Sequence, residues 1–137
     1  MKKQLIQTAL AALTLAAAGY AQSAQPLRVI VPFEFIAGSS TLRAGQYTVS
    51  RLVNTSAVAI RPAENARGVI MLTSRLESPG RREIGELVFH RYGDRYFLAE
   101  VWDADRSTGS QIPTTAQERE RAQNSRKVLA MIFVAAR

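Results

Sequence analysis

Cysteine is absent from the 137-residue sequence, and histidine and tryptophan occur once each. Without cysteine, the chain can form no disulfide, no thiolate metal site and no thiol nucleophile. A domain of this size does not need disulfides, because its hydrophobic core can stabilise it. The sequence also has no nucleophile elbow, phosphate-binding loop or dinucleotide fingerprint. We therefore expect no enzymatic activity, no cofactor and no metal ion.

Basic and acidic residues are interspersed along the chain. The sequence has 18 lysine and arginine residues against 11 aspartate and glutamate residues, which gives a net charge of +7. Nucleic-acid-binding proteins more often carry a clustered basic stripe. The composition predicts a mixed surface with a mild positive bias and no nucleic-acid partner.

The N-terminus has the layout of a secretory signal peptide. Lys2 and Lys3 form a basic start, residues 5–18 are an apolar run, and Gly19-Tyr20-Ala21 supplies small residues for a cleavage site. The apolar run is too short to span a membrane as a helix. We expect cleavage after Ala21, and a buried N-terminal helix is the alternative.

Removal of residues 1–21 as a signal peptide leaves residues 22–137, which suffice for one domain and are too few for two. No later segment has the length and apolarity of a membrane-spanning helix. We therefore predict a single β domain that is exported to the periplasm or the extracellular space, with no membrane span after signal removal.

Runs of β-branched and aromatic residues recur along this domain, separated by turn residues. Their spacing is typical of a mainly β fold, a small antiparallel barrel or sandwich of about seven strands. Pro32 lacks an amide hydrogen, so the first strand should be an edge or should bulge there. The expected strands cover residues 27–36, 47–53, 56–61, 67–73, 85–92, 95–102 and 128–134. The expected connections include a charged loop over 74–82, a polar loop over 103–109 and a short extended piece over 110–112.

One short surface helix is expected over residues 116–123, near the C-terminus. Thr114 or Thr115 is followed three residues later by Gln117 or Glu118, which is the pattern of a capping box. Alanine is the only apolar residue type in the helix, so the helix should contribute little to the core.

The stretch from Gly85 to Trp102 predicts a hairpin, because Gly93-Asp94 between two apolar runs is typical of a two-residue type II′ turn. The resulting register places His90 and Trp102 on opposite faces. One face is expected to pair Tyr92 with Arg95, His90 with Phe97, Val88 with Ala99, and Glu86 with Val101. The other is expected to pair Arg91 with Tyr96, Phe89 with Leu98, Leu87 with Glu100, and Gly85 with Trp102.

The candidate ligand-binding residues of this hairpin share one face: His90, Tyr92, Arg95 and Phe97. A catalytic histidine needs an orienting carboxylate, and a metal site needs several ligands. The nearest acids in the expected register are Asp94 and Glu86. We favour a structural role in which the His90 ring stacks on Phe97 and Tyr92.

Arginine and aromatic residues alternate in the same hairpin, and Glu100 accompanies them. Such a set can bind an anion, or it can form cross-strand cation–π and ion pairs that fix the register. We favour the second interpretation for Arg91 and Tyr96, and for Arg95 and Tyr92.

The segment from Asp103 to Gly109 has oxygen-bearing side chains at alternating positions, as calcium loops do. Thr108 stands where the invariant glycine should be, and Thr114 stands in place of the bidentate glutamate. A solvated loop is therefore the favoured interpretation, and an irregular calcium site is the alternative.

The C-terminal segment 128–134 is apolar on both alternating faces, which is typical of an interior strand. We expect this strand to complete its own sheet, since neighbouring segments usually pair within a domain. Insertion into a neighbouring subunit is the alternative.

Three segments together resemble a family of small exported bacterial β proteins: Val31-Pro32-Phe33-Glu34-Phe35, residues 42–49 with Ala44-Gly45-Gln46-Tyr47-Thr48-Val49, and residues 87–98 with Phe89-His90-Arg91-Tyr92-Gly93-Asp94. They cover most of the domain in the same order as in that family. Arg43 stands where such proteins often have proline. The family has no assigned activity, so the resemblance implies an exported β domain and no catalytic residue.

The sequence thus favours an exported, non-enzymatic binding or structural module at the cell envelope, whose partner is an unknown protein or envelope component. Such a module should have an uncovered strand edge or an apolar patch, and self-association is possible. The alternative is a carrier of a small apolar ligand, with an interior barrel cavity lined by side chains such as Phe33, Phe35 and Phe133. An enzyme, the third option, requires His90 beside a carboxylate in a cleft.

Overall fold

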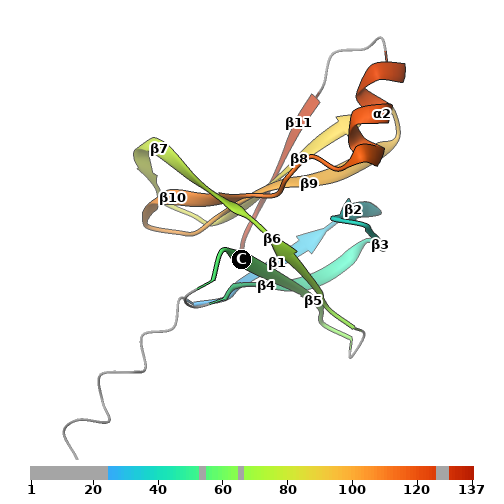
Figure 1. Cartoon of the computed structure of the whole chain (residues 1–137). Helices are drawn as coiled ribbons and strands as arrows, with labels where there is room; N and C mark the ends of the chain where they lie inside the picture. The colour runs from blue at the N-terminus through green and yellow to red at the C-terminus, as the bar shows by residue number, and fades with distance from the viewer. Residues whose placement is uncertain (1–24, 53–54, 65–66, 126–129) are drawn as a thin grey trace, which may run out of the picture.

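The computed structural model describes residues 25–52, 55–64, 67–125 and 130–137, and shows a mainly β fold. In these ranges the chain forms eleven strands in two sheets and one helix near the C-terminus (Figure 1). The expected fold class is confirmed, and the strand count of about seven is too low. The two sheets do not close into a barrel in the described part of the chain, so the sandwich is the form adopted. The predicted signal peptide and its cleavage site lie outside the described residues.

The smaller sheet has four antiparallel strands in the order β1-β4-β5-β6. Their bounds are β1 Leu27–Val31, β4 Gly45–Arg51, β5 Ala57–Pro62 and β6 Val69–Leu72. Side chains in β1 alternate between buried and exposed, because successive residues of a strand point to opposite faces. One face of β1 therefore lies on the core and the other in solvent, whereas residues Ala57 to Ile60 of β5 are buried on both faces.

The larger sheet has the strand order β11-β8-β9-β10-β7, with β2 beside β9 and β3 beside β2. Its strands are β2 Phe35–Ala37, β3 Ser40–Leu42, β7 Ser74–Arg82, β8 Glu86–Tyr92, β9 Arg95–Trp102, β10 Arg106–Gln111 and β11 Ala130–Ala135. Figure 1 shows the β7–β10 arm at one end of this sheet and the helix α2 (Ala116–Asn124) at the other.

The segment 27–36 was expected to be one strand, but it contributes to both sheets. β1 ends at Val31, Pro32 lies between the strands, and β2 begins at Phe35. Proline has no amide hydrogen to continue the ladder, and it is tolerated where a strand ends. β1 is an edge strand, as expected at Pro32, but the expected continuation of the strand to residue 36 is wrong. Pro32 lies where the chain crosses from the smaller sheet to the larger one.

The core lies between the two sheets and is filled by aromatic and β-branched side chains. Phe35 packs edge-to-face on Phe89 with ring centroids 5.2 Å apart, and on Tyr47 at 5.3 Å. Phe33 stacks on Tyr96 at a centroid distance of 3.9 Å. Because these rings come from both sheets, their contacts hold the sandwich together.

Two segments expected to be loops are strands in the structure. Residues 74–82 form β7, and the 103–109 segment is a short turn followed by β10. β7 and β10 pair antiparallel and carry mainly exposed polar side chains, so they lack the apolar alternation that identifies a strand. At the turn, Asp105 adopts a left-handed φ of 59°, which aspartate tolerates better than most residues.

The hairpin of β8 and β9 has the expected turn. Gly93 has a φ of 63°, whereas Asp94 is not among the described residues with positive φ, which fits a type II′ turn. The four pairs nearest the turn have the expected register, but a bulge lies between Val88 and Phe89. Beyond the bulge the expected register is wrong, and the structure pairs Val88 with Glu100, Leu87 with Val101, and Glu86 with Trp102.

This bulge changes which side chains share a face, because one extra residue in a strand reverses the alternation. We call the side of the larger sheet that points away from the smaller sheet its outer face. His90 and Trp102 both lie on the outer face, so the expectation that they lie on opposite faces is wrong. The sequence contains no proline or unpaired glycine that marks the bulge, so the shift could not be anticipated.

β11 was expected to be an interior strand, but it is an edge strand. It pairs antiparallel with β8 only, apart from one bridge between Val29 and Ala136. Val134 and Ile132 point toward the core, whereas Met131 and Phe133 are 48% and 57% exposed on the outer face. The expectation that this strand completes its own sheet is confirmed, and the apolar residues of its second face remain uncovered.

Candidate functional site

The helix α2 lies over the outer face of the larger sheet and begins at a well-formed cap. Thr115 is the N-cap, and its side-chain oxygen accepts a hydrogen bond from the backbone N–H of Glu118 at 3.2 Å. This satisfies one of the free N–H groups at the helix start. The predicted cap is therefore confirmed, and the helix ends one residue later than expected.

The carboxylate of Glu118 points down from α2 onto the sheet. Its Oε1 lies 2.9 Å from His90 Nδ1 and accepts a hydrogen bond from the Tyr92 hydroxyl at 3.1 Å. Glu118 is only 4% exposed and is the buried residue of an otherwise solvent-facing helix. Since α2 has no large apolar side chain, this carboxylate is its main attachment to β8.

Glu118 is the functional-site residue that sequence reasoning missed. Asp94 and Glu86 were expected to be the acids nearest His90, and the structure places neither of them on its ring. Glu118 was considered only as a member of the capping box. A signal was nevertheless present, because a helix without large apolar residues needs a polar contact to hold it against a sheet.

The surroundings of this carboxylate favour neutral Tyr92. Burial, the negative charge of Glu118 and the hydrogen bond to Glu118 together raise the pKa of Tyr92 to about 12. The Tyr92 ring meets Phe97 edge-to-face at a centroid distance of 5.7 Å, and Phe97 is 2% exposed. His90, Tyr92 and Phe97 therefore lie together beneath α2, which confirms the prediction that they share one face.

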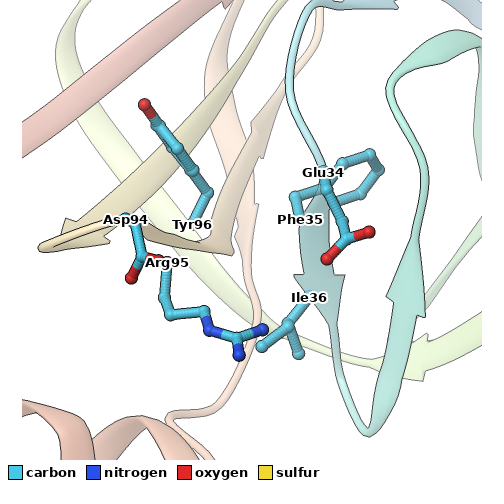
Figure 2. Close-up of a pocket in the computed structure, with 6 residues that line it drawn as sticks. All are labelled: Glu34, Phe35, Ile36, Asp94, Arg95 and Tyr96. Carbon is cyan, nitrogen blue, oxygen red and sulfur yellow. The ribbon is translucent and has the colours of Figure 1, made fainter.

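Arg95, the fourth candidate residue, belongs to a different part of the surface. It lines a hollow of about 230 Å³ formed by Glu34, Phe35, Ile36, Asp94, Arg95 and Tyr96. Figure 2 shows its guanidinium extended toward Ile36, with the Glu34 carboxylate on the neighbouring segment. One guanidinium and two carboxylates give the hollow no clear preference for a ligand of one charge.

Two further surface hollows, of about 390 Å³ and about 120 Å³, lie elsewhere in the described structure. The larger is formed around Leu27, Ile84, Asp103 and Arg137, and the smaller around Arg51 and Ser110. None of the three hollows is lined by His90, Tyr92 or Glu118. The carboxylate–histidine pair that an enzyme requires is present, but it lies under α2 and in none of these three hollows.

The aspartates of the segment that resembles a calcium loop make structural contacts with neighbouring strands. Asp103 forms an ion pair with Arg51 at 3.0 Å, and the Asp105 backbone bonds to Arg82 and Arg81. Among the described residues there is no cluster of three or more histidine, aspartate or glutamate side chains that could hold a metal ion.

A second polar cluster surrounds Trp102 on the outer face. Its indole N–H donates to Glu100 at 2.7 Å, and the Arg82 guanidinium lies 4.0 Å above its ring while it pairs with Glu86. The ring covers Gly109 so closely that a β-carbon there would lie 2.6 Å from it. The predicted cation–π contact of Arg91 with Tyr96 is also present, at 5.4 Å, whereas Glu100 has joined Trp102 instead.

The side chains proposed to line a carrier cavity do not share one interior space. Phe35 is buried and in contact with other rings, and Phe33 is packed on Tyr96 and Phe89. Phe133 is exposed on the edge strand, so its expected interior position is wrong. The alternative of a small-ligand carrier stays a prediction.

Met131 and Phe133 form, with the backbone of β11, an uncovered apolar edge of the larger sheet. Their side chains lie beside His90 and Val88, their partners on β8. The six residues of β11 include neither a charge nor a proline. An edge of this kind is a template for pairing with another strand.

No family model matches the chain, and no curated protein or solved structure matches it either. In the described ranges there is also no helix of the length and apolarity needed to cross a membrane. The resemblance to small exported β proteins therefore stays a prediction.

Proposed function

We propose that this chain is an exported, non-enzymatic binding module of the cell envelope, which binds its partner by accepting an extended strand at the β11 edge. The observation that supports this most strongly is the neutral, apolar edge of β11 with Met131 and Phe133 exposed. Addition of a strand to an open sheet edge supplies backbone hydrogen bonds for affinity and side-chain contacts for specificity.

The use of Glu118 supports a structural role for His90. A catalytic histidine needs a carboxylate on one ring nitrogen and access to substrate on the other. Here the Glu118 carboxylate is shared between His90 and the Tyr92 hydroxyl, and it attaches α2 to the sheet. We therefore assign the group to positioning α2 on β8.

Photocrosslinking in cells tests the proposed binding edge. A photoreactive phenylalanine analogue replaces Phe133 on β11 or, as a matched control, Leu72 on β6, which is 76% exposed. We expect a covalent adduct in the envelope fraction from position 133 and none from position 72. Equal adducts from both positions, or none from position 133, would contradict the proposal.

The mass of the exported protein tests the proposed location. A chain beginning at Gln22 in the periplasm or the medium agrees with cleavage after Ala21. Retention of the intact chain in the cytosol would contradict an envelope role.

A further inference from the structure

We infer that the strand accepted by β11 is β11 of a second copy of this chain, in a two-fold antiparallel pairing centred on Ile132. The inference rests on the proposed function and specifies the partner at the same edge. It follows from the direction of the backbone groups, from the chemistry of the other edges and from the symmetry of the pairing.

The hydrogen bonds at the end of β11 fix the direction of its backbone groups. The Ala136 N–H donates to the Gly85 carbonyl at 2.8 Å, toward the β8 side, whereas the Arg137 N–H donates to Arg28 on the opposite side at 2.8 Å. Successive residues of a strand alternate in this direction. The N–H and C=O groups of Met131 and Phe133 therefore point away from β8, into the open edge.

The other edge strands have features that block such pairing. β7 carries charges and a proline, and the edge of β1 meets the end of β11 through the bridge between Val29 and Ala136. β6 and β3 are neutral edge strands, and Ile70 and Leu72 of β6 are exposed, but β6 is only four residues long and β3 only three. Charges, prolines and short lengths are the usual protections of an edge strand, and six-residue β11 has none of them.

Pairing of two β11 strands about Ile132 brings matching groups together. The outward N–H of Met131 in one copy faces the C=O of Phe133 in the other, and the outward C=O of Met131 faces the N–H of that Phe133. The two-fold axis produces the same pair of hydrogen bonds a second time. The same register sets the Met131 thioether beside the partner's Phe133 ring on the outer face. Contacts between sulfur and aromatic rings are favourable, and no charge is buried.

Symmetry also favours β11 over the other edges as the partner. A strand paired with itself about a two-fold axis closes after two copies, whereas pairing of β11 with β6 or β7 continues into an open filament. Pairing with β7 would also place arginine and glutamate side chains opposite the apolar residues of β11. The predicted assembly is therefore a closed dimer with a continuous sheet.

Sedimentation equilibrium of the purified protein over a range of concentrations tests this inference. We expect a reversible equilibrium between monomer and dimer. Phe133→Pro removes an outward N–H without touching the ladder to β8, so it should weaken the dimer by about a hundredfold or more. Phe133→Lys keeps the N–H but adds a charge, and it should weaken the dimer as well, which covers the case in which the proline variant folds poorly.

The matched controls are Leu72→Pro and Leu72→Lys. The Thr73 N–H bonds to Ser56, so by alternation the Leu72 N–H also points to an open edge, that of β6. Dimerisation unchanged by these substitutions supports the inference. A wild-type protein that stays monomeric, assembles beyond two copies, or loses its dimer through the Leu72 variants would overturn it. In the monomeric case, an adduct from position 133 to a different protein in cells would still support the proposed function.

Discussion

β7 and β11 are the two ends of the strand path β11-β8-β9-β10-β7 in the larger sheet, and they have opposite chemistry. β7 contains three arginines, one glutamate and one proline in nine residues, and its Arg75 and Glu77 pair at 3.4 Å in solvent. β11 contains only alanine, methionine, isoleucine, phenylalanine and valine. Both edges have backbone groups on one side that no neighbouring strand of the described sheet engages along their length. The contrast indicates that one edge is protected against association and that the other is built for it.

Proline substitutions within β11 should distinguish the side that faces β8 from the open side. The substitution on the β8 side should produce the largest change in stability. The Ile132 N–H faces β8, so Ile132→Pro breaks the ladder and leaves a carbonyl of β8 without a donor. We expect the free energy of unfolding to fall by about 1–3 kcal/mol more than in Phe133→Pro, measured by chemical denaturation of monomeric protein. Equal losses in the two variants would show that the two sides of β11 are not as different as proposed.

Removal of the Glu118 carboxylate should have the next largest effect. Glu118→Ala leaves the His90 and Tyr92 donors partly buried without their acceptor, and α2 should detach from β8 on the outer face. We expect a loss of about 1–3 kcal/mol in the free energy of unfolding. Glu120→Ala, on the exposed side of the same helix, is the control and should change stability by about 0.5 kcal/mol or less. Equal effects of the two substitutions would contradict the role given to Glu118.

Removing Arg75 and Glu77 from the first half of β7 should make that part of the edge resemble β11. Arg75→Val combined with Glu77→Val removes two exposed side chains, so stability should change by about 0.5 kcal/mol or less. Association should nevertheless extend beyond the dimer, because a second apolar edge becomes available. Light scattering measures the change, and a mass that stays that of the dimer would show that Pro79, Arg81 and Arg82 suffice to protect this edge.

Tyr92 should give the smallest effect, confined to high pH. Its pKa in the folded protein is raised to about 12, above the ordinary value of 10.0, so the folded state retains the phenol proton that the unfolded state loses. The stabilisation from this proton is complete below pH 10 and is lost as pH rises toward about 12. Phenolate absorbance should show a tyrosine titrating near pH 12 that is missing in Tyr92→Phe. Identical titration curves would contradict the contact with Glu118.

The sequence predicted the parts of the fold in which apolar residues alternate or a turn has a distinct residue. Pro32 correctly indicated an edge strand, and Gly93 correctly marked the tight turn. β7 was missed because none of its residues is buried, so its sequence shows no apolar alternation. The apolar residues of β11 were taken for those of an interior strand, because sequence alone does not distinguish burial in a core from exposure at an edge.

The candidate site was predicted in part. His90, Tyr92 and Phe97 share a face because the register near the turn is fixed by Gly93 and Asp94. The bulge after Val88 then changed the partners of Glu86 and Glu100, so distant parts of the hairpin could not be placed. Glu118 lies 28 residues from His90 along the chain, and only the packing of α2 on the sheet brings them together.

Amide hydrogen exchange in β11 at low and high protein concentration tests the central claim most directly. Ile132 and Val134 donate toward β8 and should be protected at both concentrations. Met131 and Phe133 should exchange rapidly in dilute protein and become protected as the dimer forms. Protection of Met131 and Phe133 that does not change with concentration, or their rapid exchange at every concentration, would contradict pairing of two copies at this edge.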